Sequence, residues 1–186
     1  MRLYHSIFCL LLLLSVAGSA RGQLAPAAKD SLIKKIRAVF QRINSDTTLR
    51  VVSLGPDDLE EAIGGIPDNG AEARGYFRHD TLYKFYLNVG LSFGPKTYEY
   101  YYDRGEIVFI YEKDQHFPPK GEGLDYEKLV TGFEGRFYFN KGKLIEKIVK
   151  RYDTFMSEEI NAVYIKELLN VSSFVKQLHK NLKQKK

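Results

Sequence analysis

The apolar positions near the start of the chain recur at helical spacing. Between residues 27 and 43, counted from Leu32, they recur at spacings of 1, 4, 7, 8 and 11, at Leu32, Ile33, Ile36, Val39, Phe40 and Ile43. This period places them on one side of an amphipathic helix, which we expect to run from Ala27 to Ile43. A short strand is expected at residues 49–54. Pro56 then begins a second short helix, which Gly64 and Gly65 end.

From Ala71 to Val149 the pattern changes to the alternation that is typical of β-strands. A seven-residue motif occurs three times there, starting at Tyr76, Tyr101 and Tyr138. Each copy has two aromatic residues, two polar residues, a Gly or Asp, one more polar residue, and Leu or Ile. The motif predicts a β-hairpin, because a glycine with positive φ completes a bulged turn. Since the copies are unequally spaced, we expect three hairpins of one sheet rather than a solenoid.

Two connections and a helical C-terminal region complete the predicted fold. Residues 91–95 predict a tight turn, and residues 114–128, with two prolines and two glycines, predict a long loop of about fifteen residues. Helical spacing returns after Val149 in two apolar stripes, at Met156, Ile160, Val163, Tyr164 and Leu168 and at Val171, Phe174, Val175, Leu178 and Leu182. The predicted class is α+β, an antiparallel sheet of about six strands with an N-terminal helix and two C-terminal helices packed on it.

Residues 1–22 have the three parts of a secretory signal peptide. Arg2 is the basic part, residues 7–16 are the apolar part, and residues 17–20 are the small residues that precede cleavage. The apolar run is shorter than the roughly 20 residues of a membrane-spanning helix. Cleavage is expected after Ala20 or, in our preferred interpretation, after Gly22.

The expected mature chain, residues 23–186, forms one domain that is secreted or periplasmic. The single cysteine, Cys9, lies inside the apolar run and leaves with the signal peptide. Disulfides, thiol catalysis and cysteine metal sites are therefore excluded for residues 23–186. A domain of this length can be stable on its hydrophobic core alone.

Positive charge is concentrated at the C-terminus. The whole chain has a net charge of +5, but two arginines belong to the predicted signal peptide, and five lysines lie in the last eleven residues, at Lys176, Lys180, Lys183, Lys185 and Lys186. Residues 23–175 have a net charge of −2. This distribution argues against a nucleic-acid partner. The lysines are interpreted as a solvated helix end that complements the helix dipole, or as a peripheral contact with an anionic surface.

No motif in the chain predicts a catalytic, metal or cofactor site. The histidines after the signal peptide, His79, His116 and His179, lack partners at metal-ligand spacing, and no HExxH, GxSxG or phosphate-binding glycine loop occurs. We therefore predict no catalytic residues, no metal and no cofactor. The alternative, a hydrolase that acts on envelope polymers, would need converging polar residues such as His116 with Asp114 or Glu122.

The unusual feature of the chain is its aromatic content. Most of its 13 tyrosines and 12 phenylalanines lie between Tyr76 and Phe139. Aromatic residues favour strands and stabilise sheets through cross-strand pairs, so a purely structural role is one interpretation. The other is a binding surface, because amphipathic tyrosines on a free sheet face can line a groove for a sugar, lipid or peptide. The candidate ligand-binding residues are Tyr83, Tyr86, Tyr98, Tyr100, Tyr102 and Tyr138.

The hairpin sequences YYYDRGEIVFIYE and GRFYFNKGKLIEK resemble those of secreted bacterial proteins of unknown function, and they are loosely similar to MORN-like repeats. The resemblance covers residues 75–149. It implies a bacterial secreted protein and assigns no site, since MORN repeats are regularly spaced and richer in glycine.

These patterns together predict an exported, non-enzymatic binding or interaction protein of the bacterial envelope that uses an aromatic-rich sheet surface. Its partner would be an unknown envelope ligand or protein. A carrier of an apolar ligand, with the sheet curled around it, is a third hypothesis beside the hydrolase.

Overall fold

The computed structural model describes residues 25–152 and 159–184. The predicted signal peptide, Met156 and the last two lysines lie outside the described residues. The helices are α1 (Pro26–Ser45), α2 (Pro56–Ile63), α3 (Ala162–Leu168) and α4 (Ser172–Gln184). The strands are β1 (Arg50–Ser53), β2 (Ala71–Arg78), β3 (Thr81–Leu91), β4 (Gly94–Asp103), β5 (Glu106–His116), β6 (Pro119–Lys120), β7 (Gly123–Leu124), β8 (Val130–Asn140) and β9 (Lys143–Arg151).

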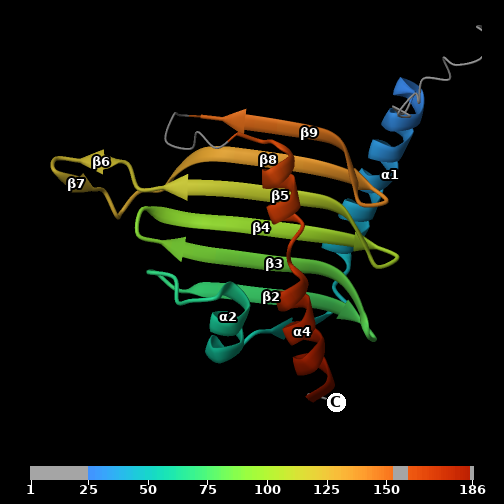
Figure 1. The fold of residues 1–186 in the computed structure, drawn as a ribbon, viewed down its shortest axis with the longest axis horizontal. Helices are drawn as coiled ribbons and strands as arrows, with labels where there is room; N and C mark the ends of the chain where they lie inside the picture. Colours follow the sequence, from blue (N-terminus) through green and yellow to red (C-terminus); the bar gives the residue numbers. More distant parts are fainter. Residues whose placement is uncertain (1–24, 153–158, 185–186) are drawn as a thin grey trace, which may run out of the picture.

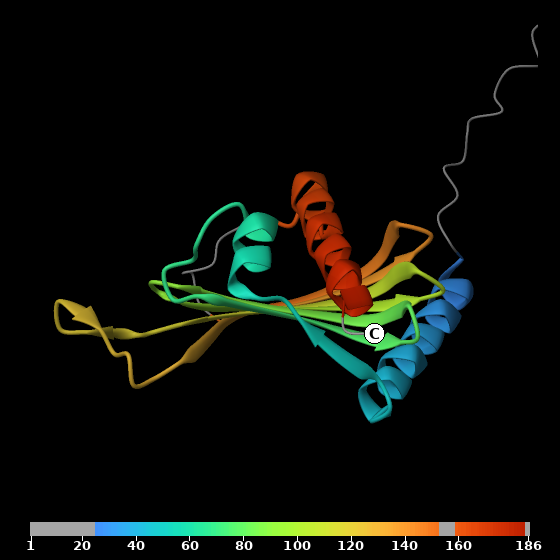
Figure 2. The same cartoon turned by 90° about the horizontal axis from the view of Figure 1, so that it is seen from below.

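The fold is α+β, as the sequence predicts. Seven strands, one more than the expected six, form an antiparallel sheet in the order β1-β2-β3-β4-β5-β8-β9 (Figure 1). Helix α1 lies across one face of this sheet, and α2 and α4 lie on the opposite face (Figure 2). No helix among the described residues is long and apolar enough to cross a membrane.

The three predicted hairpins are confirmed. They are β2–β3, β4–β5 and β8–β9, and their turns contain the positive-φ residues His79, Arg104 and Lys141. Each hairpin also has a register shift at the aromatic pair, so that one extra residue bulges from the second strand. The extra residues are Tyr83, Val108 and Ile145, each seven positions after the first residue of its motif.

The larger core lies between the sheet and α2, α3 and α4. Phe77, Phe85 and Phe137 of the sheet are fully buried in it, and Phe174 and Leu178 of α4 are part of the same core. These α4 residues belong to the apolar stripe that the helical spacing predicts, and burying them stabilises the fold by about 1.5–3 kcal/mol each. The helix therefore folds onto the sheet through the face that its sequence pattern marks.

The region from Asp114 to Lys128 differs from the prediction of a long loop. Strand β5 continues through His116, and β6 and β7 form a small two-stranded hairpin that projects beyond the main sheet (Figure 1). The buried side of this part of β5 carries Glu112, Asp114 and His116, so its alternation is not one of apolar and polar residues. A strand with polar residues on both faces has no sequence signature of burial, which is why the prediction was wrong here.

Candidate binding face

Helix α1 crosses the ends of the three hairpins. Its buried residues Ile33, Ile36 and Ile43 form a second core with Tyr101, Phe109 and Tyr138 of the sheet. The three bulge residues, Tyr83, Val108 and Ile145, pack against the same core. Because a bulge turns two successive side chains toward one face, each hairpin presents an additional apolar side chain to α1. The repeated motif therefore builds the surface on which this helix lies.

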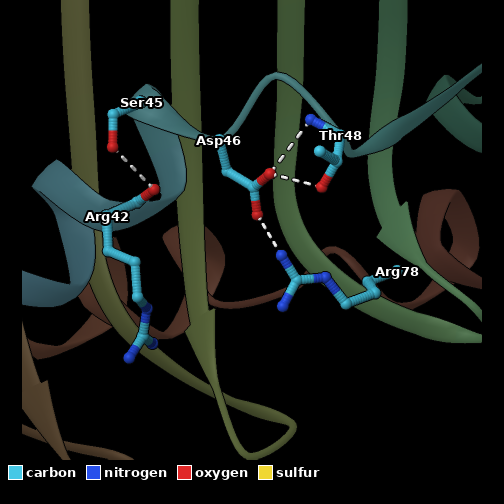
Figure 3. A network of polar contacts seen from close by, with 5 residues as sticks. All are labelled: Arg42, Ser45, Asp46, Thr48 and Arg78. Atoms are coloured by element: carbon cyan, nitrogen blue, oxygen red, sulfur yellow. Dashed lines mark hydrogen bonds and ion pairs between the residues drawn. The ribbon is translucent and has the colours of Figure 1, made fainter.

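Polar contacts hold α1 at both ends. Lys29 pairs with Glu146 of β9, and Arg42 lies 3.4 Å from Asp103 at the end of β4. Just after α1, Asp46 accepts hydrogen bonds from the backbone and side chain of Thr48, at 3.0 and 2.6 Å, and pairs with Arg78 (Figure 3).

Part of the α1 face of the sheet is not covered by α1 (Figure 2). The strand register places one row of side chains across six strands on this part, in the order Arg74, Tyr86, Glu99, Tyr111, Arg136 and Ile148. We call these six residues the cation–tyrosine row. At a strand spacing of about 4.8 Å the row spans roughly 24 Å. Its first five members are partly buried, as expected for side chains that stand next to one another on an open sheet.

The tyrosines of the row contact the cations beside them. The guanidinium of Arg74 lies 5.6 Å from the ring centre of Tyr86, and that of Arg136 lies 5.3 Å from the ring centre of Tyr111. Both distances are in the range of cation–π attraction. These contacts fix the rings and leave partly exposed aromatic and charged groups in alternation across the sheet.

Glu134 holds Tyr111 of the row in place. Its carboxylate accepts hydrogen bonds from the hydroxyls of Tyr111, at 2.8 Å, and Tyr152, at 3.2 Å. The bond from Tyr111 is the main reason that the pKa of Glu134 lies below its usual value. Burial, followed by this same bond, raises the pKa of Tyr111 to about 12. At neutral pH Tyr111 is therefore protonated and Glu134 is charged, which is the state that this hydrogen bond needs.

The six candidate tyrosines lie in different environments. Tyr83 and Tyr86 are on the α1 face and are partly exposed, but Tyr138 on that face is only 4% exposed, beneath α1. The other three are on the opposite face, where Tyr98 is partly exposed and Tyr100 and Tyr102 are buried in the larger core, at 3% and 7%. Helices thus lie on both faces of the sheet, and the three buried tyrosines of this set fit the purely structural interpretation.

The polar residues that the hydrolase hypothesis requires do not all lie together in the structure. Asp114 and His116 lie two positions apart on the face of β5 opposite α1, and both are buried. Glu122 is exposed between β6 and β7, outside the main sheet. Lys96 pairs with Asp114 at 3.3 Å, and Tyr164 of α3 donates a hydrogen bond to Glu112 on the same side of β5.

The remaining candidate residues lie apart from the row. His79 is exposed in the β2–β3 turn, and His179 packs edge-on against Phe77 in the larger core. Within the described residues no cluster of three or more His, Cys, Asp or Glu is placed to hold a metal ion. On α4, Lys176 and Lys183 are exposed, while Lys180 lies 3.6 Å from Asp58 of α2.

Sequence reasoning selected Tyr86 but missed the other members of the row. The available signal was weak: Arg74, Glu99 and Arg136 are charged residues next to buried positions in their strands, which is typical of the more polar face of a strand. Only the pairing of strands aligns them into one row. No family model, no curated protein and no solved structure matches this chain.

Proposed function

We propose that the protein is an exported, non-enzymatic binding protein of the bacterial envelope, and that the cation–tyrosine row is its binding surface. The ligand class that fits best is an extended polar polymer with saccharide rings. The observation that carries the proposal is the alternation of partly exposed Tyr86 and Tyr111 with charged residues along one line across the sheet.

The chemistry of the row supports a saccharide. Each tyrosine presents part of an aromatic ring for stacking, and the hydroxyl of Tyr111, which donates to Glu134, can still accept a hydrogen bond. Arg74, Glu99 and Arg136 stand beside these rings and supply donors and acceptors for sugar hydroxyl groups. A ligand that lies across the strands would contact each of these groups in turn. The charges along the row make it a poor surface for the apolar ligand of the carrier hypothesis.

Export is the second part of the proposal, and it is supported by the signal-like pattern of residues 1–22. The buried tyrosines serve a different role from the row. Tyr100 and Tyr102 pack beneath the C-terminal helices and Tyr138 beneath α1, so we assign them to the cores and assign ligand contact to Tyr86 and Tyr111.

The experiment is a binding measurement on residues 23–186 with purified peptidoglycan and an array of envelope glycans. We expect a saturable interaction that the double variant Tyr86→Ser/Tyr111→Ser weakens by about tenfold or more, because loss of a central contact residue costs more than about 1 kcal/mol. The matched control is Tyr126→Ser, since Tyr126 is 67% exposed near the β6–β7 hairpin and is not on the row.

Equal binding by the double variant and the wild type would refute the row as the surface. If the double variant unfolds, Arg74→Gln at the far end of the row replaces it, because this side chain is 41% exposed and its loss should leave the cores intact. Absence of binding to every glycan tested would contradict the saccharide class. Native mass spectrometry of the protein from its host envelope provides an independent check on the ligand's mass.

A further inference from the structure

A cavity of about 250 Å³ lies between α1 and the sheet, beside one end of the cation–tyrosine row. Its walls come from Ile36, Arg37, Phe40 and Gln41 of α1 and from Phe109, Arg136 and Tyr138 of the sheet. Four of these seven side chains are apolar or aromatic, two are arginines and one is a glutamine. The cavity therefore combines an apolar interior with guanidinium groups, a combination that the surface of the row does not have.

The aromatic walls hold one another in place. Phe109 contacts Phe40 edge-on, with ring centres 5.5 Å apart, and contacts Tyr138 with ring centres 5.0 Å apart. Both Phe109 and Tyr138 are buried. An apolar protein cavity of about 150 Å³ is large enough for benzene. This cavity accordingly has room for one ring and a short substituent.

The two arginines retain hydrogen-bond donors. Arg37 lies over the ring of Tyr138, with its guanidinium carbon 5.9 Å from the ring centre, and among the described residues no carboxylate pairs with it. Arg136 has one ion pair with Glu134, at 3.6 Å, which is longer than a hydrogen bond. That carboxylate already accepts bonds from Tyr111 and Tyr152. A guanidinium has five N–H donors, so both arginines can bind a further anion.

From these contacts we infer that the cavity is a binding site for a small carboxylate with a single ring. The ring would pack against Phe40, Phe109 and Tyr138. The carboxylate would accept charge-assisted hydrogen bonds from Arg37 and Arg136, whose planar donor groups match its geometry. The apolar walls alone would accept any small apolar molecule, and it is the pair of arginines that selects an anion.

This site is separate from the binding of a polymer by the row, although Arg136 belongs to both. Arg37 lines the cavity and is not in the row, whereas Tyr86 is in the row and does not line the cavity. Variants of these two residues therefore distinguish the two proposals. Loss of polymer binding without loss of carboxylate binding, or the reverse, identifies which of the two sites a variant has altered.

The test uses 3-phenylpropionate and its uncharged amide as probes, with binding measured by calorimetry and protein-observed NMR on residues 23–186. We expect the carboxylate to bind at least tenfold more tightly than the amide, because a hydrogen bond to a charged group corresponds to about a tenfold or larger factor in affinity. Arg37→Gln should weaken carboxylate binding by a similar factor. Amide resonances of α1, β5 and β8 should shift on binding.

Two variants serve as controls. Arg42→Gln removes an arginine of α1 that lies outside the cavity, and Tyr86→Ser alters only the row, so both should bind the carboxylate like the wild type. Equal affinity for the carboxylate and the amide would overturn the inference, as would full binding by Arg37→Gln. Failure of the carboxylate to bind at millimolar concentration would also overturn it, whatever the result with envelope glycans.

Discussion

The hydroxyl of Tyr101 joins the sheet to the C-terminal end of α1, and its removal tests how this helix is held. The side chain is completely buried, with its ring 4.9 Å from that of Phe40. Its hydroxyl lies 2.5 Å from a carboxylate oxygen of Glu99 and 3.0 Å from the side-chain oxygen of Asn44. The substitution Tyr101→Phe deletes this hydroxyl and keeps the ring, so the apolar packing is preserved.

The expected loss follows from the charge on Glu99. A hydrogen bond to a charged group contributes about 1.5–3 kcal/mol. Glu99 keeps its ion pair with Lys84 at 3.2 Å and is 24% exposed, so water and the lysine still stabilise its charge when the Tyr101 hydroxyl is removed. We therefore expect the lower part of the range, about 1.5–2 kcal/mol of unfolding free energy. For a chain of this size that corresponds to a fall in Tm of about 3–8 °C.

The assay is urea unfolding of both proteins at pH 7, with the slope of unfolding free energy against urea fitted separately. An unchanged slope indicates that the loss arises in the native state. Tyr126→Phe is the control, since this exposed side chain should change stability by less than about 0.5 kcal/mol. A loss below 0.5 kcal/mol for Tyr101→Phe would refute the reasoning, because the buried hydroxyl would then contribute no more than the exposed one.

Two further predictions concern a glycine and a carboxylate. Gly94→Ala should lower the unfolding free energy by about 2–3 kcal/mol or more, because the φ of Gly94 is +147° and the new Cβ would lie 2.2 Å from the carbonyl oxygen of Gln115. Gly105→Ala, whose new Cβ meets no neighbouring atom, should lower it by only about 1–2 kcal/mol in the same unfolding assay. The pKa of Asp46 is lowered, chiefly by the hydrogen bond from the Thr48 side chain. Its stabilising effect is therefore present above its ordinary pKa of 3.8 and is lost as the pH falls through the lowered value. The difference in unfolding free energy between wild type and Asp46→Asn should therefore narrow as the pH falls below 3.8, and a difference that stays constant or grows there would contradict this.

Local patterns predicted the elements well wherever one face of an element is apolar. The stripe containing Ile33, Ile36 and Ile43 forms the buried side of α1, as expected. The aromatic motifs predicted the three hairpins, because turn chemistry and strand alternation both act over a few residues. The bulges were expected in the turns and instead lie in the second strands, at Tyr83, Val108 and Ile145. Prediction was wrong at residues 114–128, where Asp114 and His116 face inward and the apolar signal of a buried strand is absent.

The candidate site was only partly predictable. Tyr86 was selected from the sequence, but Tyr100 and Tyr102 were selected with it and are buried beneath helices. Which face a tyrosine occupies depends on register, and which face is covered depends on where helices from both ends of the chain dock. Neither the register nor the docking position of a helix can be read from the residues of a single strand.

The sequence by itself thus determined the class of the fold, the hairpins and the buried sides of α1 and α4, because these depend on contacts between near neighbours in the chain. The tertiary structure decided that α1 lies on one face and the C-terminal helices on the other. It also decided that Arg74, Tyr86, Glu99, Tyr111 and Arg136 align across five strands. The physical reason is that α1 packs on residues contributed by all three hairpins, and those residues form one surface only after the sheet has assembled.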